Sequence, residues 1–291
     1  GVPVAVVSFQ DEEGRFGPTT GSAVWSGAVA LAEADARRAL SGESFGEARA
    51  RMAHLVSGEV DPARFTGFVE AHIEQGPWLW EAGEAVGVVE AIVGIDRLTA
   101  SFTGEQNHAG TTPMSRRRDA FQGLVDAASR LNAALAGIAT PATVWTIGHV
   151  SGEPGAPSIV PGRCTFSVQW RDAELWRLDR MAGIVDETLR SVAEARRLGL
   201  QVARSARVEP GRFDPGLCDA LASAADGRTP GRWRRMTSGA LHDASNVARL
   251  MPAAMLFVPS IGGISHSFEE DTDPADLVAG AEVMAEAALR L

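Results

Sequence analysis

The stretch Phe68-Val69-Glu70-Ala71-His72-Ile73-Glu74-Gln75-Gly76-Pro77 decides the fold of this chain. Residues 68–73 read as a strand, and the Gly76-Pro77 pair then breaks the chain, so that a short helix is expected to follow. This reading places His72 near the end of the strand. Open α/β sheets present their binding sites at strand ends, so the stretch predicts both an α/β fold and a functional histidine.

The sequence before this stretch also has an α/β pattern, within a first part that runs to about residue 96. The run Val4-Ala5-Val6-Val7-Ser8-Phe9 is short, apolar and rich in β-branched residues. Such a run is typical of a buried parallel strand. Alanine, acidic and apolar residues from about 22 to 40 predict a helix.

A middle part, about 97–207, reads as strand, helix, strand, strand, helix, strand. These elements are expected at 97–103, 117–135, 143–150, 163–170, 178–197 and 200–208. The βαββαβ order predicts a ferredoxin-like layer of sheet and helices, whose edge strand can pair with a second copy.

The third part, about 208–291, returns to the pattern of the first. We expect helices near 215–225 and 243–250, a strand at 254–258, and a closing helix from about 274 with Asp273 as its N-cap. The first and third parts therefore predict one α/β domain, 1–96 with 208–291, that is split by an inserted domain at 97–207.

Composition excludes several kinds of partner. The formal net charge of −10 over 291 residues argues against nucleic acid or an anionic membrane. No apolar stretch reaches the ~18 residues that a membrane span needs. The N-terminal residues lack the features of a signal peptide. Cys164 and Cys218 form no CxxC pair, so we expect free buried thiols and a cytoplasmic protein.

Four short motifs carry carboxylates and imidazoles, the side chains that hold and use divalent metals. Besides the stretch around His72, they are Asp11-Glu12-Glu13-Gly14, Asn107-His108-Ala109-Gly110-Thr111-Thr112-Pro113-Met114 and Gly263-Ile264-Ser265-His266-Ser267. Neighbouring side chains on a regular strand point to opposite faces, so Glu12 and Glu13 can serve one site only where a strand ends. Gly14 permits the turn that this requires.

In order and content these motifs resemble the amidohydrolases that cleave N-carbamoyl-L-amino acids, allantoate and related ureido compounds. That family is a branch of the two-metal aminoacylase and carboxypeptidase superfamily. The resemblance implies a two-metal aminopeptidase-like catalytic domain and an inserted lid that also forms a homodimer. It implies two divalent metal ions, zinc or manganese, and a small ureido acid as the substrate.

The resemblance also implies roles for individual residues. Glu12 matches the general base that takes a proton from water, and Glu13, His72 and His266 match metal ligands. Gln75 would face the ureido group of the substrate. His108 matches a histidine of the lid that reaches the active site of the partner subunit and stabilises the oxyanion there.

Other positions match the family's substrate-binding residues or depart from them. Arg171 matches an arginine that binds the substrate carboxylate, a task suited to a planar guanidinium. Ser158 stands at the position of a substrate-binding Asn, and Gln169 replaces an Asp. His242 and Asp243 lie in a loop that resembles the family's SGAGHDA motif, and we expect them to support the site structurally. Arg117 and Asp119 are expected to hold the start of a helix.

The upstream metal ligands of the family, a His-x-Asp motif and a bridging Asp, have no counterpart here, because the first histidine is His54. The chain also begins with Gly1 rather than Met, so we expect a fragment whose metal occupancy is reduced or absent, and which is inactive alone. Two alternatives stay open. One is an aminoacylase or dipeptidase of the same superfamily, and the other is a truncated, non-catalytic protein that forms dimers.

Overall fold

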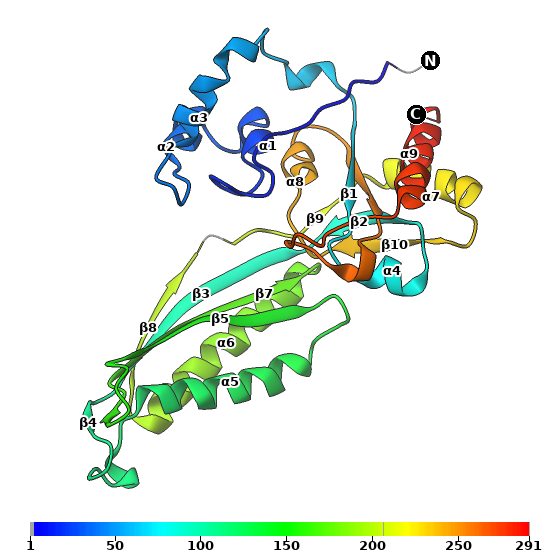
Figure 1. Cartoon of the computed structure of the whole chain (residues 1–291). Helices are drawn as coiled ribbons and strands as arrows, with labels where there is room; N and C mark the ends of the chain where they lie inside the picture. Colours follow the sequence, from blue (N-terminus) through cyan, green and yellow to red (C-terminus); the bar gives the residue numbers. More distant parts are fainter. Residues whose placement is uncertain (1–2, 206, 291) are drawn as a thin grey trace. The chain divides into compact units, whose positions relative to one another are not determined.

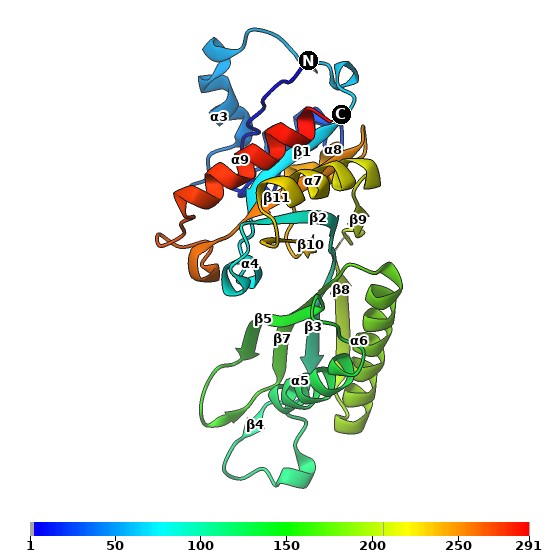
Figure 2. The same cartoon turned by 90° about the vertical axis from the view of Figure 1, so that its right-hand side faces the viewer.

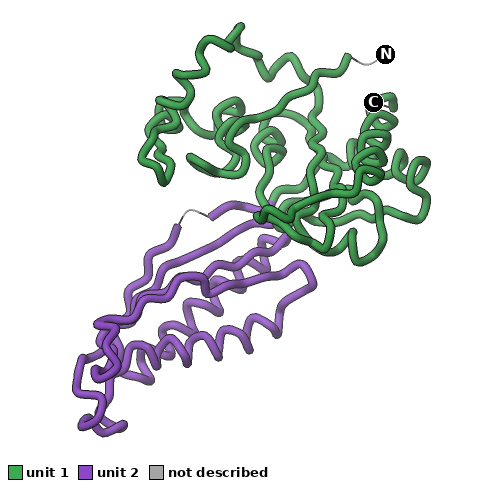
Figure 3. Tube along the Cα trace, viewed as in Figure 1, with its two compact units in different colours: residues 1–92, 211–291 green, residues 93–210 purple. Residues whose placement is uncertain are grey.

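The computed structural model describes residues 3–205 and 207–290, and these form two compact units. Unit 1 comprises residues 1–92 and 211–291, and unit 2 comprises residues 93–210 (Figure 3). Each unit has a hydrophobic core of its own, so each can be described by itself.

Unit 2 is a four-stranded antiparallel sheet with two long helices on one face (Figure 1). The strands lie in the order β5 (Val144–Glu153), β7 (Arg163–Asp172), β3 (Gly94–Thr103), β8 (Gly199–Arg204). The helices are α5 (Ala120–Ala136) and α6 (Leu175–Arg196). A short ribbon of β4 (Asn107–His108) and β6 (Ile159–Val160) extends from the sheet. The predicted βαββαβ order is confirmed, and Asp119 caps α5 as expected, accepting from the backbone N–H groups of Phe121 and Gln122.

Buried and partly buried residues alternate along β7, so the two faces of this sheet differ. Cys164, Phe166, Val168 and Trp170 are fully buried and belong to the core that also includes side chains of α5 and α6. The residues between them are only partly buried and lie on the opposite face, as the period of two in a strand requires. That face of β7 is polar, and it carries Arg171.

Unit 1 is built on a mixed sheet in the order β1 (Phe68–Ile73), β11 (Ala253–Val258), β2 (Val86–Ile92), β10 (Trp233–Ser238), with β9 (Gly211–Arg212) paired to β2. β1 and β11 are parallel, β2 is antiparallel to β11, and β10 is parallel to β2. Every residue of β11 is buried, which explains why this strand is a continuous apolar run.

Helices cover both faces of this sheet (Figure 2). Helices α7 (Pro215–Arg228) and α9 (Pro274–Ala288) pack on each other and on the central strands. A Cβ at Gly280 of α9 would lie 2.6 Å from Val258, so this helix approaches β11 closely. The ring of Phe257, the preceding residue, instead contacts His242 at the start of α8 (Asp243–Val247). Because neighbouring residues of a strand point to opposite faces, α8 and α9 lie on opposite sides of β11.

The remaining elements of unit 1 are short helices. They are α1 (Thr20–Trp25), α2 (Leu31–Ala36), α3 (Phe45–Arg51) and α4 (Trp78–Ala82). Single 3₁₀ turns lie at Ala53–Leu55, Pro62–Arg64 and Ile261–Gly263 in unit 1 and at Met114–Arg116 in unit 2. Among the described residues, every helix is too short or too polar to traverse a lipid bilayer.

Two of the sequence predictions for the first part are wrong. Residues 3–9 form no strand, and Val4 and Val6 are 70% and 96% exposed. None of the described strands pairs with this run, so its backbone groups stay in water and only Phe9 packs, against Trp25 and Phe68. The expected helix over 22–40 is interrupted after α1, because Gly27 adopts φ 74° and leaves the helical region.

Candidate functional site

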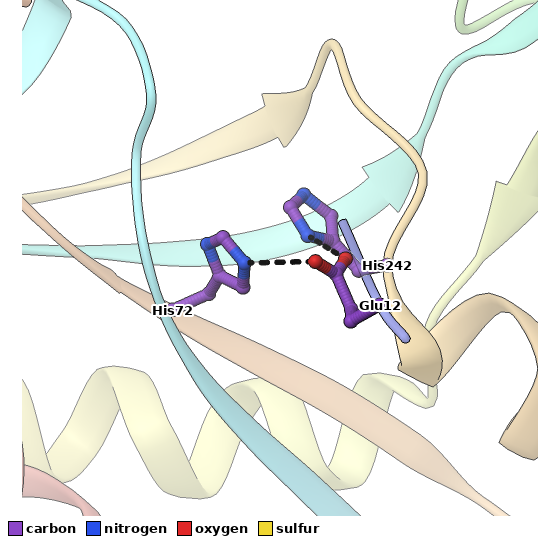
Figure 4. Close-up of side chains that lie close together, drawn as sticks. All are labelled: Glu12, His72 and His242. Carbon is purple, nitrogen blue, oxygen red and sulfur yellow. Dashed lines mark ion pairs between the residues drawn. The ribbon is translucent and has the colours of Figure 1, made fainter. Parts of the chain in front are cut away.

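Three side chains from distant parts of the sequence converge in unit 1. Glu12, His72 and His242 each offer a ligand atom, and these atoms lie within 4.8 Å of one another. One carboxylate oxygen of Glu12 is 3.9 Å from His72 Nε2, and the other is 3.8 Å from His242 Nδ1 (Figure 4). We call these three residues the histidine cluster.

The two imidazoles are held by the sheet and by α8. His72 lies in β1, opposite Phe257 of β11, and His242 is the N-cap of α8. The two imidazole rings are 4.5 Å apart between centroids, and both contact the Phe257 ring edge-on. A rigid aromatic ring therefore fixes the separation of the two candidate ligands.

Hydrogen bonds fix which nitrogen of His72 faces the cluster. His72 Nδ1 lies 2.8 Å from the backbone carbonyl oxygen of Ile73, so Nδ1–H donates to that oxygen. Its Nε2 then faces the cluster. A bond of this kind to a carbonyl oxygen is the usual support of a metal-binding histidine.

His242 has the same arrangement with its nitrogens exchanged. Its Nε2 lies 2.8 Å from Ser238 Oγ, whereas its Nδ1 is buried and has no hydrogen-bond partner among the described residues. A buried imidazole nitrogen without a partner is costly unless something binds it. Imidazole nitrogens are common ligands of zinc, and the two of the histidine cluster lie next to a carboxylate, so the residues fit a divalent metal ion with an acid beside it.

The surroundings give the two imidazoles opposite protonation behaviour. Burial lowers the pKa of His72, but Glu12, the Ile73 carbonyl and Glu70 together outweigh burial and raise it to about 9. Burial, with a smaller effect of His72, lowers the pKa of His242 to about 3. In the metal-free protein His72 is therefore the imidazole that carries the proton.

Glu70 is a further buried acid next to this cluster. Its carboxylate accepts a 2.7 Å hydrogen bond from the backbone N–H of Ala244 at the start of α8. Burial and the nearby Asp243 raise the pKa of Glu70 to about 7, although that hydrogen bond acts in the opposite direction. Glu70 therefore connects β1, which carries His72, to the start of α8, which His242 caps.

The loop of residues 10–21 presents Glu12 and Glu13 in different directions. Its backbone folds onto the start of α1 through hydrogen bonds from Thr19, Thr20 and Gly21 to the carbonyl oxygens of residues 12, 11 and 10. A Cβ at Gly21 would lie 2.7 Å from the carbonyl oxygen of residue 10, so only glycine allows this approach. The tight loop lets neighbouring carboxylates reach separate partners.

Glu13 belongs to a second, more exposed group, which we call the loop cluster. Its carboxylate is 3.3 Å from His266 Nε2 and accepts a 3.1 Å hydrogen bond from the Gln75 side chain. Gln75 and His266 both have positive φ, 55° and 56°. Residues in this left-handed region are strained unless they are Gly, and such strain is often found at functional sites.

The turn after β1 is fixed by Glu74, which is nearly buried. Its two carboxylate oxygens accept from the backbone N–H groups of Trp78 and Leu79 at the start of α4. The backbone N–H of Gln75 donates to Ser260 Oγ after β11. The motif around His72 is therefore tied to the loop that carries His266.

His108 lies in unit 2, in the β4–β6 ribbon. Its Nδ1 accepts from the backbone N–H groups of Gly110 and Thr111, at 3.0 and 3.2 Å. The neutral ring then carries its proton on Nε2, which makes Nε2–H a hydrogen-bond donor. Arg117 donates to the carbonyl oxygen of Thr112 and so holds this loop, whereas it was expected to hold the start of a helix.

Ser158 and Arg171 lie at opposite ends of unit 2. The backbone carbonyl of Ser158 accepts from Ala109 N–H, so Ser158 lies beside His108 in the ribbon. Arg171 is near the carboxyl end of β7 and pairs with Ile95. The chain leaves the sheet for the ribbon at the other end of β7, before Arg163, which lies roughly 27 Å from Arg171 at about 3.4 Å per residue.

The structure thus brings the predicted site residues together in part. Glu12 meets His72, and Glu13 meets His266 and Gln75, all within unit 1. His108, Ser158 and Arg171 belong to unit 2. The structure places His242, expected only to support the site, with its Nδ1 toward Glu12. The hydroxyl of Ser238, four residues earlier in the same loop motif, lies 2.8 Å from His242 Nε2 and orients the ring.

Comparison with known proteins identifies the family of the chain. The profile of Peptidase family M20/M25/M40 matches residues 1–290. An N-carbamoyl-L-amino-acid amidohydrolase of Rhizobium meliloti is 32% identical, with 99% of this chain and 69% of that protein covered. An allantoate amidohydrolase of Escherichia coli K12 is 36% identical, with 75% of this chain and 53% of that protein covered.

Solved structures give the same result. The crystal structure of an amidase of the hydantoinase/carbamoylase family from Burkholderia phymatum superposes with a TM-score of 0.89 at 38% identity. It covers 98% of this chain, which spans 70% of that protein. The chain therefore belongs to peptidase family M20/M25/M40, in the branch whose members include N-carbamoyl-L-amino-acid and allantoate amidohydrolases.

Proposed function

We propose that the protein is a metal-dependent amidohydrolase that cleaves the carbamoyl C–N bond of N-carbamoyl-L-amino acids or related ureido acids such as allantoate. The observation that carries the proposal is the histidine cluster, in which a buried, unpartnered nitrogen of His242 faces Glu12 and His72. Two relatives of this chain are named as amidohydrolases of N-carbamoyl-L-amino acids and of allantoate. A solved structure of the hydantoinase/carbamoylase family has the same fold.

The residues that would hold metal ions fall into the two clusters. His72 and His242 would bind one divalent ion, and Glu13 and His266 would bind a second. Imidazole and carboxylate ligands suit zinc or manganese. When bound, such ions polarise a carbonyl group and make water more acidic.

The other residues act on the proton and on the substrate. Glu12 lies between the two imidazoles and takes the proton of the attacking water. His108 donates from Nε2–H to the oxygen that becomes negative at the carbamoyl carbon. Arg171 binds the substrate carboxylate, and Gln75 and Ser158 bind the rest of the substrate. The products are ammonia, carbon dioxide and the amino compound.

The geometry of unit 2 favours a homodimer. His108 and Arg171 lie at opposite ends of the sheet, roughly 27 Å or more apart along β7. A ureido acid is far shorter than that distance, so one chain cannot present both residues to one substrate molecule. Two chains that pair through unit 2 can do so, with His108 contributed by the partner.

Glu12 provides the decisive test, because a base and a ligand respond differently to substitution. In Glu12→Gln we expect metal content to be retained while kcat falls by about 10²–10⁴-fold, the usual contribution of a general base. Elemental analysis after dialysis measures the metal, and ammonia release from an N-carbamoyl-L-amino acid measures kcat. His72→Ala should lose metal, whereas His149→Ala, outside both clusters, should not.

The substrate range decides between this proposal and the alternatives. Ammonia release from N-carbamoyl amino acids or allantoate supports it. Hydrolysis of N-acetyl amino acids or dipeptides alone would instead indicate an aminoacylase or dipeptidase. A stable dimer that holds less than one metal ion per chain and hydrolyses none of these would indicate a non-catalytic protein.

A further inference from the structure

We propose that Asn246 is a positioning residue for Glu12, because its side-chain amide ties α8 to the loop of residues 10–21 that carries this base. The inference rests on the proposed function, in which Glu12 takes the proton of the attacking water. It adds a residue that acts through the backbone of this loop rather than on the substrate.

The amide group of Asn246 uses both of its hydrogens to hold the loop. Asn246 Nδ2 donates to Thr19 Oγ1 and to Ser22 Oγ, each at 2.9 Å. Thr19 lies in the loop and Ser22 in α1, and both are buried. An NH₂ group has two donors, so this one side chain fixes two nearby points of the chain. Helices α1 and α8 lie side by side at this contact (Figure 1).

Thr19 passes this restraint to Glu12 through its backbone. Its N–H donates to the carbonyl oxygen of Glu12 at 3.0 Å. Thr19 has φ 51°, in the left-handed region, which is rare for a β-branched residue and costs free energy. Such a conformation persists only where the surrounding contacts impose it. Without the hydrogen bond from Asn246, we therefore expect Thr19 to relax and its hydrogen bond to Glu12 to weaken.

Packing holds one side of this loop only weakly. A pocket of about 490 Å³ borders the loop, and Phe16, Pro18 and Thr19 line it. Side chains that face such a space lack neighbouring atoms on that side and lose the corresponding contact energy. The hydrogen bonds from Asn246 therefore carry a larger share of the restraint on the loop.

The helix that carries Asn246 also carries one of the groups that face Glu12. His242 caps α8, and its Nδ1 lies 3.8 Å from one carboxylate oxygen of Glu12. Asn246 follows four residues later in the same helix. One short element thus holds both the imidazole and the loop, which fixes the carboxylate relative to the imidazole. A displacement of about 1 Å in such an arrangement can lower the rate by about a hundredfold.

The first test compares Asn246→Ala with the wild type in the turnover of an N-carbamoyl-L-amino acid. We expect kcat to fall by about ten- to a hundredfold, while KM and the metal content after dialysis stay within about twofold. This split is expected because the substitution displaces the base and leaves the substrate-binding residues and metal ligands in place. Circular dichroism and thermal unfolding check that the fold is retained.

Substitutions of Thr19 test the path from Asn246 to Glu12. Thr19→Val removes the hydroxyl at nearly constant shape and should lower kcat as Asn246→Ala does. Thr19→Ser keeps the hydroxyl and should retain kcat within about threefold. The double variant Asn246→Ala/Thr19→Val should lose about as much as one substitution alone, because both break the same hydrogen bond. A loss near the product of the two would show that they act independently and would contradict the assignment.

Asn132→Ala is the matched control. Asn132, in α5 of unit 2, also uses its side-chain amide in a hydrogen bond, and its oxygen accepts from Trp145 Nε1 at 2.9 Å. Its replacement should leave kcat within about twofold of the wild type. The comparison separates an effect at Glu12 from the general effect of removing a hydrogen-bonded asparagine.

The outcomes distinguish this inference from the proposed function. If the wild type releases no ammonia, the proposed function fails, and amide hydrogen exchange of the metal-free protein still tests Asn246. The amides of Thr19, Thr20 and Gly21, which donate to carbonyl oxygens of the loop, should exchange at least about tenfold faster in Asn246→Ala, while those of β11 keep their rates.

Three results would overturn the assignment of Asn246. One is unchanged exchange at these three amides, and another is an unchanged kcat in the active enzyme. The third is a rise in KM or a loss of metal that accounts for the lower activity, because Asn246 would then act on the substrate or on the metal ligands rather than on Glu12.

Discussion

The two imidazoles of the histidine cluster hold protons with very different strength, and this gives a prediction for metal binding. The pKa of His72 is about 9 and that of His242 is about 3, so at pH 7 only His72 is protonated. A metal ion binds only the neutral imidazole. Binding at pH 7 should therefore release about one proton from these two side chains, and the affinity should rise about tenfold per pH unit as pH increases toward 9.

Calorimetric titration with zinc in buffers of different ionisation enthalpy measures this proton. A heat of binding that does not depend on the buffer would contradict the prediction. His149→Ala, outside both clusters, is the control, and its heat of binding should depend on the buffer as that of the wild type does.

A second residue-scale prediction concerns Glu74, whose carboxylate accepts two backbone N–H groups at the start of α4. Glutamine at this position can accept through one oxygen only, and its NH₂ group would face a second donor. We expect Glu74→Gln to lower the free energy of unfolding by about 1–2 kcal/mol. Glu81→Gln removes the same charge from an exposed position of α4 and should change it by less than about 0.5 kcal/mol.

Urea denaturation of the three proteins measures these differences. Equal midpoints for Glu74→Gln and the wild type would show that the two hydrogen bonds contribute nothing net.

The candidate site could be predicted from sequence wherever a motif contained the functional residue itself. His72, His266 and Glu13 were identified in this way, and the structure places Glu13 beside His266 and His72 beside Glu12. The position of His242 could not be predicted, because it depends on how the loop after β10 returns across Phe257. The backbone hydrogen bonds that set the tautomer of His108 were equally absent from the sequence pattern.

At the scale of elements, the loop after β11 packs closely against the start of α4, because Gly263 has no side chain. Gly263 has φ 70°, and a Cβ there would lie 2.8 Å from both Cα and Cβ of Pro77. Gly263→Ala should therefore destabilise the fold by roughly 1–3 kcal/mol and displace the loop that carries His266. Thermal unfolding gives the stability, and zinc content gives the effect on the loop cluster.

Gly227→Ala is the matched control for this substitution. Gly227 lies near the end of α7 in the same unit, and a Cβ there would meet nothing within 4 Å. Alanine is the better helix former, so we expect unchanged or slightly higher stability, by up to about 1 kcal/mol. Similar behaviour of the two variants would show that the contact with Pro77 is easily relaxed.

The clarity of the local sequence pattern explains which elements could be predicted. β3, α5, β7 and α6 alternate between clear strand and helix patterns, and each exists close to the expected bounds. β2 and β10 were not anticipated. β2 is buried at nearly every position, so no alternation marks it, and β10 carries polar residues along a sheet edge. Val4–Phe9 has the composition of a strand, but hydrogen-bond partners decide whether a strand forms.

At the scale of the whole molecule, the separation of His108 from Arg171 makes the proposed active site a property of two chains. Glu12 would act in one subunit and His108 in its partner. Glu12→Gln and His108→Ala homodimers should each be nearly inactive, since every site in them lacks one of the two groups. A mixed dimer contains one site with both defects and one site with neither.

Co-expression of the two variants, or mixing after subunit exchange, should therefore restore activity. If subunits pair at random, half of the dimers are mixed and half of their sites are intact, which gives about a quarter of the wild-type rate. Mixing Glu12→Gln with His72→Ala is the control, because both residues lie in the same cluster and no combination of chains yields an intact site. Restoration in the first mixture and none in the second would assign His108 to the partner's site. Activity that stays at the level of the separate variants in both mixtures would mean that each chain works with its own His108, and the proposed dimer would lose its functional basis.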